Sequence, residues 1–382
     1  MKPLYKKLIV VGVILILGFI VYLIWSSAVP ENPPNSFSSS TSSGFPASTP
    51  LKAPTSSSPL SPEMPQSKKL SEHQVFDYWI NQNTSEVYYL TPEGKVYAAR
   101  EGPDLEVSAQ TIDALNAIQL SPSTEKILAS FGDPRAPQWG IFDVIDKVWR
   151  PLPRDILMAT WGTKDEELIA TTQKNSSQTD LVRADISKTP PVYKMLIKNF
   201  NLHDVTLKIF SDQELLISER PSATYGARTW KLNFTTLALT LFREGEEGSY
   251  LSWGSHNQIA FQFSLPRQFR ILEGATLALA MPFPFTTFPD KCSEGQFEGG
   301  EGELYCFVPQ ASEFESLTRI LPDDYFRHAF FTHDTLYRID FPSGDFEPII
   351  LTGAIDGTRL EEGVNGLYFI NRYDKQLYRL AQ

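Results

Sequence analysis

The sequence predicts an all-β protein, a β-propeller of seven four-stranded blades preceded by one membrane helix and a disordered stalk. A hairpin pattern recurs along most of the chain, and the first 70 residues lack that pattern. Composition agrees, since 42% apolar residues in a chain of 382 suffice for a large core. Aromatic residues make up 12% of the chain, and they suit pleated strands, whereas scattered Pro and Gly interrupt helices. A helix-rich fold is therefore not expected.

The N-terminal segment predicts a membrane anchor. Leu8 to Trp25 is an unbroken apolar run, long enough as a helix to cross the hydrocarbon layer of a bilayer. Lys2, Lys6 and Lys7 precede the run, and the next basic residue is Lys52. Because the side richer in Lys and Arg stays in the cytoplasm, residues 1–7 are expected to be a cytoplasmic tail and the rest of the chain extracytoplasmic. The predicted location is the cell membrane, with a single pass.

A cleaved secretory signal is the alternative to an anchor. Ser26 and Ala28 offer a small-x-small cleavage site just after the apolar run. The run is long for the apolar region of a signal peptide, so the sequence favours an uncleaved helix.

Residues 26–70 are predicted to form a disordered stalk. Ser, Thr and Pro make up more than half of this segment, and large apolar residues are almost missing. Such a composition cannot bury enough surface to offset the entropy of ordering the chain. A coil of about 40 residues spans about 35 Å. The segment would therefore hold the domain of residues 71–382 away from the membrane.

The domain of residues 71–382 repeats one short pattern. An apolar residue heads the same strand in each copy, at steps of 40, 41, 47, 44, 45 and 63 residues: Val87, Ile127, Leu168, Leu215, Ile259, Leu304 and Leu367. A period near 43 residues fits one propeller blade. Because the last step is long, six or eight blades remain as alternatives to seven.

Each copy contains the strands of one blade. A first strand ends a few residues before the head, across a polar turn, at Ile80, Leu120, Trp161, Phe210, Trp253, Cys292 or Leu360. A third strand follows in KVYAAR, WGIFDVID, TDLVRADI, RTWKLNF, RQFRIL, DTLYRID and KQLYRL, where apolar and polar residues tend to alternate. Many copies add a fourth strand, such as VWRPLP, ALTLF or FEPII.

A closed ring explains why the pattern is repeated. Four strands cannot bury both faces of their sheet alone, and a ring of stacked sheets leaves no copy with an open face. Residues 309–332 account for the long last step, with a short helical insert around Asp323 to Phe330. A β-sandwich built from unrelated hairpins is the alternative, but it would not require a common period.

The stretches SPSTEKILAS, WGTKDEELIAT and WGSHNQIAF resemble the strand-turn-strand core of WD40-like repeats in TolB-type and related bacterial propellers. The resemblance covers most of residues 75–382. The sequence departs from the family pattern in two places, since SPSTEK lacks the Asp-Gly of the turn and no Trp-Asp pair closes a repeat. The resemblance implies a binding or assembly module, although some such propellers carry enzyme sites.

The sequence contains no recognised catalytic, metal or cofactor motif. Its histidines are His73, His203, His256, His328 and His333, and none forms an HExxH or Cys/His pattern. A loop site shared by His328, His333 and Asp334 is the weaker alternative to ordinary surface or core histidines. No G-x-S-x-G elbow or phosphate-binding glycine motif occurs. No cofactor is expected, and Asp323 and Asp324 are expected to cap the insert helix.

An acidic tract runs from Glu294 to Glu303 between the two cysteines. Its carboxylates could hold calcium, but the ordered spacing of an EF-hand is missing, so a solvated hairpin tip is favoured. The domain of residues 71–382 has 28 basic and 43 acidic residues and a net charge near −15. Nucleic acid and anionic lipid head groups are therefore not expected as partners.

A disulfide is predicted between Cys292 and Cys306, the only two cysteines. Both fall in the segment expected to lie outside, where oxidising conditions favour pairing. Alignment of the copies places Cys306 with Phe261 in the second strand and Cys292 with Trp253 in the first, which would bring the two cysteines face to face. A structural bond is favoured over a redox switch, because there is no Cys-x-x-Cys spacing.

The segment MPFPFTTFP links the fifth and sixth copies and carries Phe283, Phe285 and Phe288. Prolines could hold these rings apart as a partner contact, whereas burial in the core is the favoured alternative.

The predicted function is that of a membrane-anchored extracytoplasmic propeller that binds a protein or envelope ligand, or acts as a scaffold. The alternative is a propeller lyase or hydrolase, or a subunit of one, with polar side chains of several blades converging on the central channel. A stalked glycosyltransferase shares the anchor and stem, but the chain lacks a D-x-D pair after a strand and alternating helices.

Overall fold

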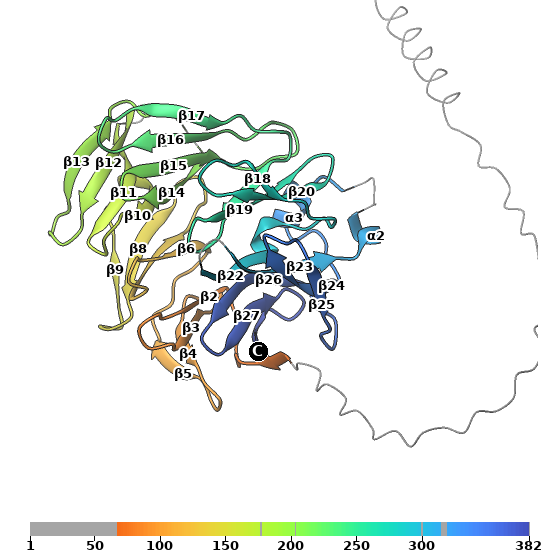
Figure 1. Cartoon of the computed structure of the whole chain (residues 1–382). Coiled ribbons are helices and arrows are strands. Elements are labelled where there is room, and N and C mark those ends of the chain that lie inside the picture. The colour runs from red at the N-terminus through yellow and green to blue at the C-terminus, as the bar shows by residue number, and fades with distance from the viewer. Residues whose placement is uncertain (1–66, 176–177, 203, 299–300, 315–318, 382) are drawn as a thin grey trace, which may run out of the picture. The chain divides into compact units, whose positions relative to one another are not determined.

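The computed structural model describes residues 67–381 except 176–177, 203, 299–300 and 315–318, and it forms a β-propeller (Figure 1). The described residues contain seven four-stranded antiparallel sheets, so the prediction of seven blades is confirmed and six or eight are wrong. The predicted membrane helix of residues 8–25 lies outside the described residues, as does the predicted stalk up to residue 66. No helix in the described part of the chain is long and apolar enough to span a bilayer.

In blades 1 to 6 the strands follow one another along the chain from the innermost to the outermost. Blades 1 and 2 contain β2 (Asp77–Ile80), β3 (Val87–Leu90), β4 (Val96–Ala99), β5 (Leu105–Ser108), β6 (Leu115–Leu120), β7 (Lys126–Phe131), β8 (Gln138–Asp143) and β9 (Val148–Pro151). Blades 3 and 4 contain β10 (Ile156–Trp161), β11 (Glu167–Asn175), β12 (Gln178–Asp185), β13 (Val192–Ile197), β14 (Val205–Ser211), β15 (Glu214–Glu219), β16 (Thr229–Asn233) and β17 (Leu239–Arg243).

The remaining blades continue this order. Blades 5 and 6 contain β18 (Tyr250–Trp253), β19 (Ile259–Ser264), β20 (Gln268–Glu273), β21 (Leu279–Met281), β22 (Cys292–Glu298), β23 (Glu301–Pro309), β24 (Asp334–Phe341) and β25 (Phe346–Ile349), and the short helix η1 (Pro289–Lys291) precedes β22. Blade 7 contains β26 (Gly357–Gly363), β27 (Gly366–Asn371) and β28 (Gln376–Leu380).

The outermost strand of blade 7 comes from the other end of the described chain. β1 (Ser67–Lys69) pairs antiparallel with β28, with Ser67 opposite Leu380. Beyond the strand, the Leu70 amide donates to the Leu377 carbonyl at 2.8 Å. β1 lies within the segment that the sequence assigns to the stalk, so the propeller begins before the expected boundary at residue 71.

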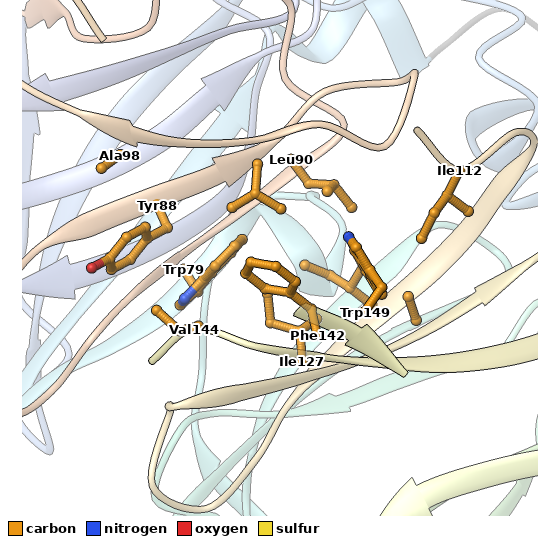
Figure 2. Close-up of a cluster of buried hydrophobic side chains, with 12 residues drawn as sticks. Trp79, Tyr88, Leu90, Ala98, Ile112, Ile127, Phe142, Val144 and Trp149 are labelled. Carbon is orange, nitrogen blue, oxygen red and sulfur yellow. The ribbon is translucent and has the colours of Figure 1, made fainter. Parts of the chain in front are cut away.

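The hydrophobic core consists of one layer between each pair of neighbouring blades. Figure 2 shows the layer between blades 1 and 2, where Trp79 stacks on Tyr88 and Phe142 contacts Trp149. Corresponding clusters fill the other six interfaces, including the one between blades 7 and 1. The seven inter-blade clusters differ in size, and the one between blades 4 and 5 has the fewest buried members: Leu216, Trp253, Ala260, Leu272 and Leu277. Both faces of every blade are thus covered, as a closed ring requires.

The turns between first and second strands are held by neighbouring blades. The Ser123 hydroxyl of blade 2 donates to Asp165 of blade 3, and the Ser123 amide donates to Asp165 Oδ1 at 3.1 Å. The amides of His256 and Ile259 in blade 5 donate to the Glu294 carboxylate of blade 6, at 2.8 and 2.6 Å. These carboxylates stabilise turns that lack the family's Asp-Gly.

The insert of blade 6 connects β23 to β24 and contains α2 (Ala311–Phe314) and α3 (Asp323–Phe326). Its side chains reach the ends of blades 4, 5 and 7: Asp323 Oδ2 accepts from the Ala223 amide at 2.8 Å, Phe326 packs edge-on against Tyr250, and His328 contacts Arg372. Figure 1 shows α3 beside the ends of these blades.

The predicted capping of the insert helix by Asp323 and Asp324 is wrong. Pro322 occupies the N-cap of α3, and no side chain caps the helix. Asp323 instead binds the Ala223 amide across the ring, and Asp324 Oδ2 accepts from the Ile320 amide at 2.7 Å, just before the helix.

Candidate functional site

A cavity of about 850 Å³ lies on the axis of the ring. Its walls come from the innermost strands of blades 2, 3, 4, 5 and 7 and from the turns that follow four of them. Hydroxyl and amide groups face it, among them those of Gln119, Thr160, Thr206, Ser252 and Asn257. The volume lies within the range of small-molecule sites. The convergence of polar side chains from several blades makes this cavity the candidate functional site.

Lys208 of β14 is the lysine that lines the cavity. Its Nζ donates a long hydrogen bond of 3.4 Å to the Trp253 carbonyl and lies 6.0 Å from the centre of the Trp253 ring. Among the described residues, no carboxylate lies within ion-pair distance of this amine. Burial lowers the pKa of Lys208 to about 8, and the Glu294 carboxylate opposes that shift.

Arg359 is the second basic residue of the cavity, and it is already paired. Its Nε and a terminal nitrogen contact the two oxygens of Asp77 at 2.9 and 2.8 Å, which joins blade 7 to blade 1. The Asp77 carboxylate raises the pKa of Arg359, so its guanidinium stays charged. Burial raises the pKa of Asp77, although Arg359 opposes the shift.

Glu361 lies two residues beyond Arg359 on β26. Burial raises the pKa of Glu361 to about 7; Arg359 opposes the shift and Asp77 adds to it. Two groups near the channel, Lys208 and Glu361, therefore change charge close to neutral pH. Displaced pKa values of this kind cluster at functional sites.

Aromatic residues form the apolar part of the cavity wall. The indole nitrogens of Trp161 and Trp253 already have acceptors, since they donate to the carbonyls of Gln119 and Gly274 at 3.0 Å. Both tryptophans are buried, and Phe210 packs edge-on against Trp253. The cavity is therefore amphipathic, with rings beside hydroxyls and one amine that has no carboxylate partner among the described residues.

A buried ion network lies between blades 6 and 7, outside the cavity lining. Lys291 Nζ contacts Asp334 at 2.5 Å and Asp356 at 2.6 Å, and Arg372 also pairs with Asp356 at 3.2 Å. Burial lowers the pKa of Lys291, but the two carboxylates raise it by more, so the amine stays charged. Thr332 donates to Asp356 from its amide and hydroxyl, both at 3.0 Å. The network anchors the end of the insert to blade 7.

The predicted disulfide between Cys292 and Cys306 is present. The two residues face each other across β22 and β23 and are buried in the layer between blades 5 and 6. The alignment that led to the prediction was one residue out relative to blade 5 and two relative to blade 3. Phe261 opposes Ser252 rather than Trp253, and Leu304 opposes Glu294 rather than Cys292. Glu294 therefore takes the position that Trp161 holds opposite Leu168 in blade 3. A long irregular hairpin shifts the first strand of blade 6.

The acidic tract is only partly a solvated tip. Glu301 is exposed, but the Glu294 side chain is fully buried and binds the two amides of blade 5. The expectation of a solvated position is wrong for Glu294. Blade 6 has this glutamate where the first strand of blade 3 has Trp161, so no indole ring fills the space beneath the neighbouring turn and the carboxylate occupies it. In the described part of the chain, no group of three His, Cys, Asp or Glu side chains is arranged to hold a metal ion.

The proline-rich link places its three phenylalanines differently. Phe288 is fully buried against Tyr325, and Phe283 is buried in the layer between blades 5 and 6. Phe285 is half-buried, stacks on Tyr337 and lines a second cavity of about 550 Å³. Of the three rings, Phe285 is the one placed to touch a partner.

The histidines have separate surroundings. His328 Nδ1 lies 3.1 Å from an Arg372 nitrogen, and His333 contacts Glu313 at 2.8 Å. His256 pairs loosely with Glu294, His73 packs on Tyr97, and His203 is outside the described residues.

Sequence reasoning did not single out Lys208, Arg359 or Glu361. The available signal was alternation: Thr206 and Lys208 are polar while Val205 and Leu207 are buried, the pattern of a strand with one wet face. Arg359 and Glu361 lie in the copy where the repeat was irregular, and β26 carries a register shift between Thr358 and Glu361.

The comparisons with known proteins support the fold. No protein-family model and no curated protein sequence matches the chain. The β-propeller domain of Cps50 (Swd1) from Myceliophteria thermophila is 9% identical, with a TM-score of 0.51 over 83% of this chain and 99% of that one. An oligogalacturonate lyase from Vibrio parahaemolyticus is 10% identical, with a TM-score of 0.54 over 82% and 90%.

TolB from Acinetobacter baumannii is also 10% identical, with a TM-score of 0.39 over 60% of each chain. At such identities a likeness concerns the fold alone. The chain is therefore a seven-bladed propeller, and its resemblance to WD40-like propellers is confirmed at that level.

Proposed function

We propose that this protein is a membrane-anchored binding module whose propeller faces outward from the cell and seats its ligand in the channel cavity. The apolar run Leu8 to Trp25, with three lysines before it, supports the anchor and its orientation. The observation that carries the site is the cavity itself, where hydroxyls, amides, rings and the amine of Lys208 converge from five blades.

The ligand is a component of the cell envelope or a protein that inserts a segment into the channel. The net charge near −15 of residues 71–382 argues against nucleic acid. Lys208 offers a donor that has no carboxylate partner in the described chain, so a ligand that accepts hydrogen bonds fits the cavity.

Site-specific photocrosslinking tests this proposal. A benzophenone amino acid replaces Ser252 in the cavity of the full-length protein, and the same residue replaces Thr240 on the outer strand β17 as a matched control. A crosslinked species that forms in cells from position 252 and not from position 240 supports the proposal. Crosslinks only from position 240, or only from a third probe placed at Phe285, would place binding elsewhere and contradict it.

A propeller lyase or hydrolase remains the second candidate. The pKa of Glu361, raised to about 7 beside the Asp77–Arg359 pair, favours it because such a carboxyl can exchange protons at neutral pH. Purified protein would be incubated with oligogalacturonate, the substrate class of the Vibrio parahaemolyticus enzyme. An ultraviolet-absorbing unsaturated product that Glu361→Gln abolishes would support a lyase, and no product would count against that substrate.

A further inference from the structure

Two lysines lie inside the propeller in contrasting surroundings. Lys291 is fully buried and held between the carboxylates of Asp334 and Asp356, at 2.5 and 2.6 Å. Lys208 lines the cavity, and among the described residues its amine contacts one carbonyl, that of Trp253, at 3.4 Å. We propose that Lys208 is a nucleophilic amine that captures an aldehyde or ketone ligand as an imine inside the channel cavity.

The reaction requires only the amine and the ligand. The lone pair of Lys208 Nζ attacks the carbonyl carbon, a C–N bond forms, and the carbonyl oxygen takes up a proton to give a carbinolamine. Loss of that oxygen as water, together with the remaining amine proton, leaves a C=N bond. One amine and one carbonyl thus give one imine and one water, without an oxidant or a reductant.

The surroundings of Lys208 favour the neutral amine that this reaction needs. Burial lowers the pKa of Lys208 to about 8. At pH 7 about one Lys208 in ten is then neutral, against about one in 3,000 for an ordinary exposed lysine. Lys291 is the opposite case, because its two carboxylates keep the amine charged and occupy its protons.

The cavity also provides room for the rest of the ligand. Thr206 lies two residues before Lys208 on β14, and both line the same cavity. Its hydroxyl and that of Ser252 can bind hydroxyl groups, whereas Phe210 and Trp253 offer apolar rings. A hydroxylated carbonyl compound of small-molecule size fits this lining. The inference rests on the proposed function only in that the same cavity must admit a ligand.

Reductive trapping tests the inference on the full-length protein. Pyridoxal 5′-phosphate is added at pH 7 with sodium cyanoborohydride, and peptide mass spectrometry measures the rate of labelling at each lysine. Propanal is used in parallel, so that the size of the probe does not decide the result. Lys208 should be labelled at least about tenfold faster than exposed Lys194 or buried Lys291, and its rate should level off above pH 8.

Equal labelling of Lys208 and Lys194 with both aldehydes would overturn the inference. Lys208→Arg keeps the charge but should abolish the fast-labelled peptide, and its circular dichroism spectrum checks the fold. If position 252 crosslinks a ligand while Lys208 shows no preference, the imine inference fails and the proposed function stands. If Lys208 is labelled fast and position 252 crosslinks nothing, the proposed binding function fails and the reactive amine stands.

Discussion

Glu361 carries a pH effect that a single substitution can isolate. Its pKa is raised from 4.5 to about 7, so the folded protein prefers the protonated acid. The stability that this preference provides is complete below pH 4.5 and is lost as the pH rises to about 7. Glu361→Gln should therefore leave stability at pH 4 almost unchanged and raise it at pH 8, by at most about 3 kcal/mol.

Urea unfolding of the wild type and the variant between pH 4 and pH 8 measures this difference. Glu244→Gln, at an exposed position, is the matched control for the loss of one carboxylate. Parallel pH curves for the wild type and Glu361→Gln would mean that the surroundings do not raise the pKa of Glu361.

Glu294 and Gly254 should act as a coupled pair. A Cβ placed on Gly254 would lie 2.1 Å from the Glu294 carboxyl carbon, so the glycine makes room for the acid. Glu294→Gln leaves one of two buried amides without an acceptor and should cost about 2 kcal/mol. Gly254→Ala should be destabilising in the wild type but much less so in a Glu294→Ala background.

Denaturant unfolding of the two single variants and the double variant measures that coupling. Additive losses of unfolding free energy would show that the two residues do not share this space.

At the scale of single residues, sequence reasoning identified the covalent contact but not the polar site. Two cysteines allow a single pairing within the chain, so the bond between Cys292 and Cys306 could be predicted although the alignment was displaced by one or two residues. Lys208 gave no comparable signal, because its partners come from strands of other blades and depend on the closure of the ring.

Among the structural elements, the hairpin of β22 and β23 depends on its disulfide. The bond closes a loop of about 15 residues and so restricts the unfolded chain. Removing the bond should therefore lower the free energy of unfolding by about 3 kcal/mol. A Cys292→Ala/Cys306→Ala variant should match the reduced wild type in unfolding free energy, and both should fall below the oxidised protein. Guanidinium titrations with and without a reductant measure this, and equal stability of all three forms would contradict the stabilising role.

The strands themselves were the most predictable elements, and their exact pairing was the least. All seven expected third strands form, from β4 to β28. They could be predicted because apolar and polar residues alternate along a strand that buries one face. Register was less certain: Trp253 opposes Ala260 rather than Ile259, and Phe210 falls in a register shift between Ile209 and Ser211. Bulges of this kind change the count by one residue without altering the hydrophobic pattern.

For the whole molecule, the proposed topology predicts where a protease can act. Protease added outside intact cells or spheroplasts should cleave within residues 26–66 and release the propeller, because that segment is expected to be outside and unfolded. Immunoblotting of the released domain measures this, and a cytoplasmic marker protein must stay intact. Full protection of the chain would reverse the proposed orientation.

The ring should open first between blades 4 and 5. Of the seven inter-blade clusters described, the one at this interface has the fewest buried residues, five, whereas that between blades 1 and 2 has twelve. Because local opening exposes the interface it breaks, it should cost least where least apolar surface is buried. Native-state hydrogen exchange should therefore show earlier exchange in β17 and β18 than in β5 and β6, and the reverse order would refute this.

The pairing of β1 with β28 also sets the order of events when the protein is made. Of the described strands, the ribosome synthesises β1 first and β28 last, so blade 7 cannot be completed until the other six blades have been translated. Until then the outer strand has no partner and blades 1 and 6 each lack a neighbour on one side. Bringing such distant segments together is entropically slow. A nascent chain that ends before β28 would therefore leave apolar faces open to chaperones and proteases, and folding of the ring would be coupled to completion of its synthesis.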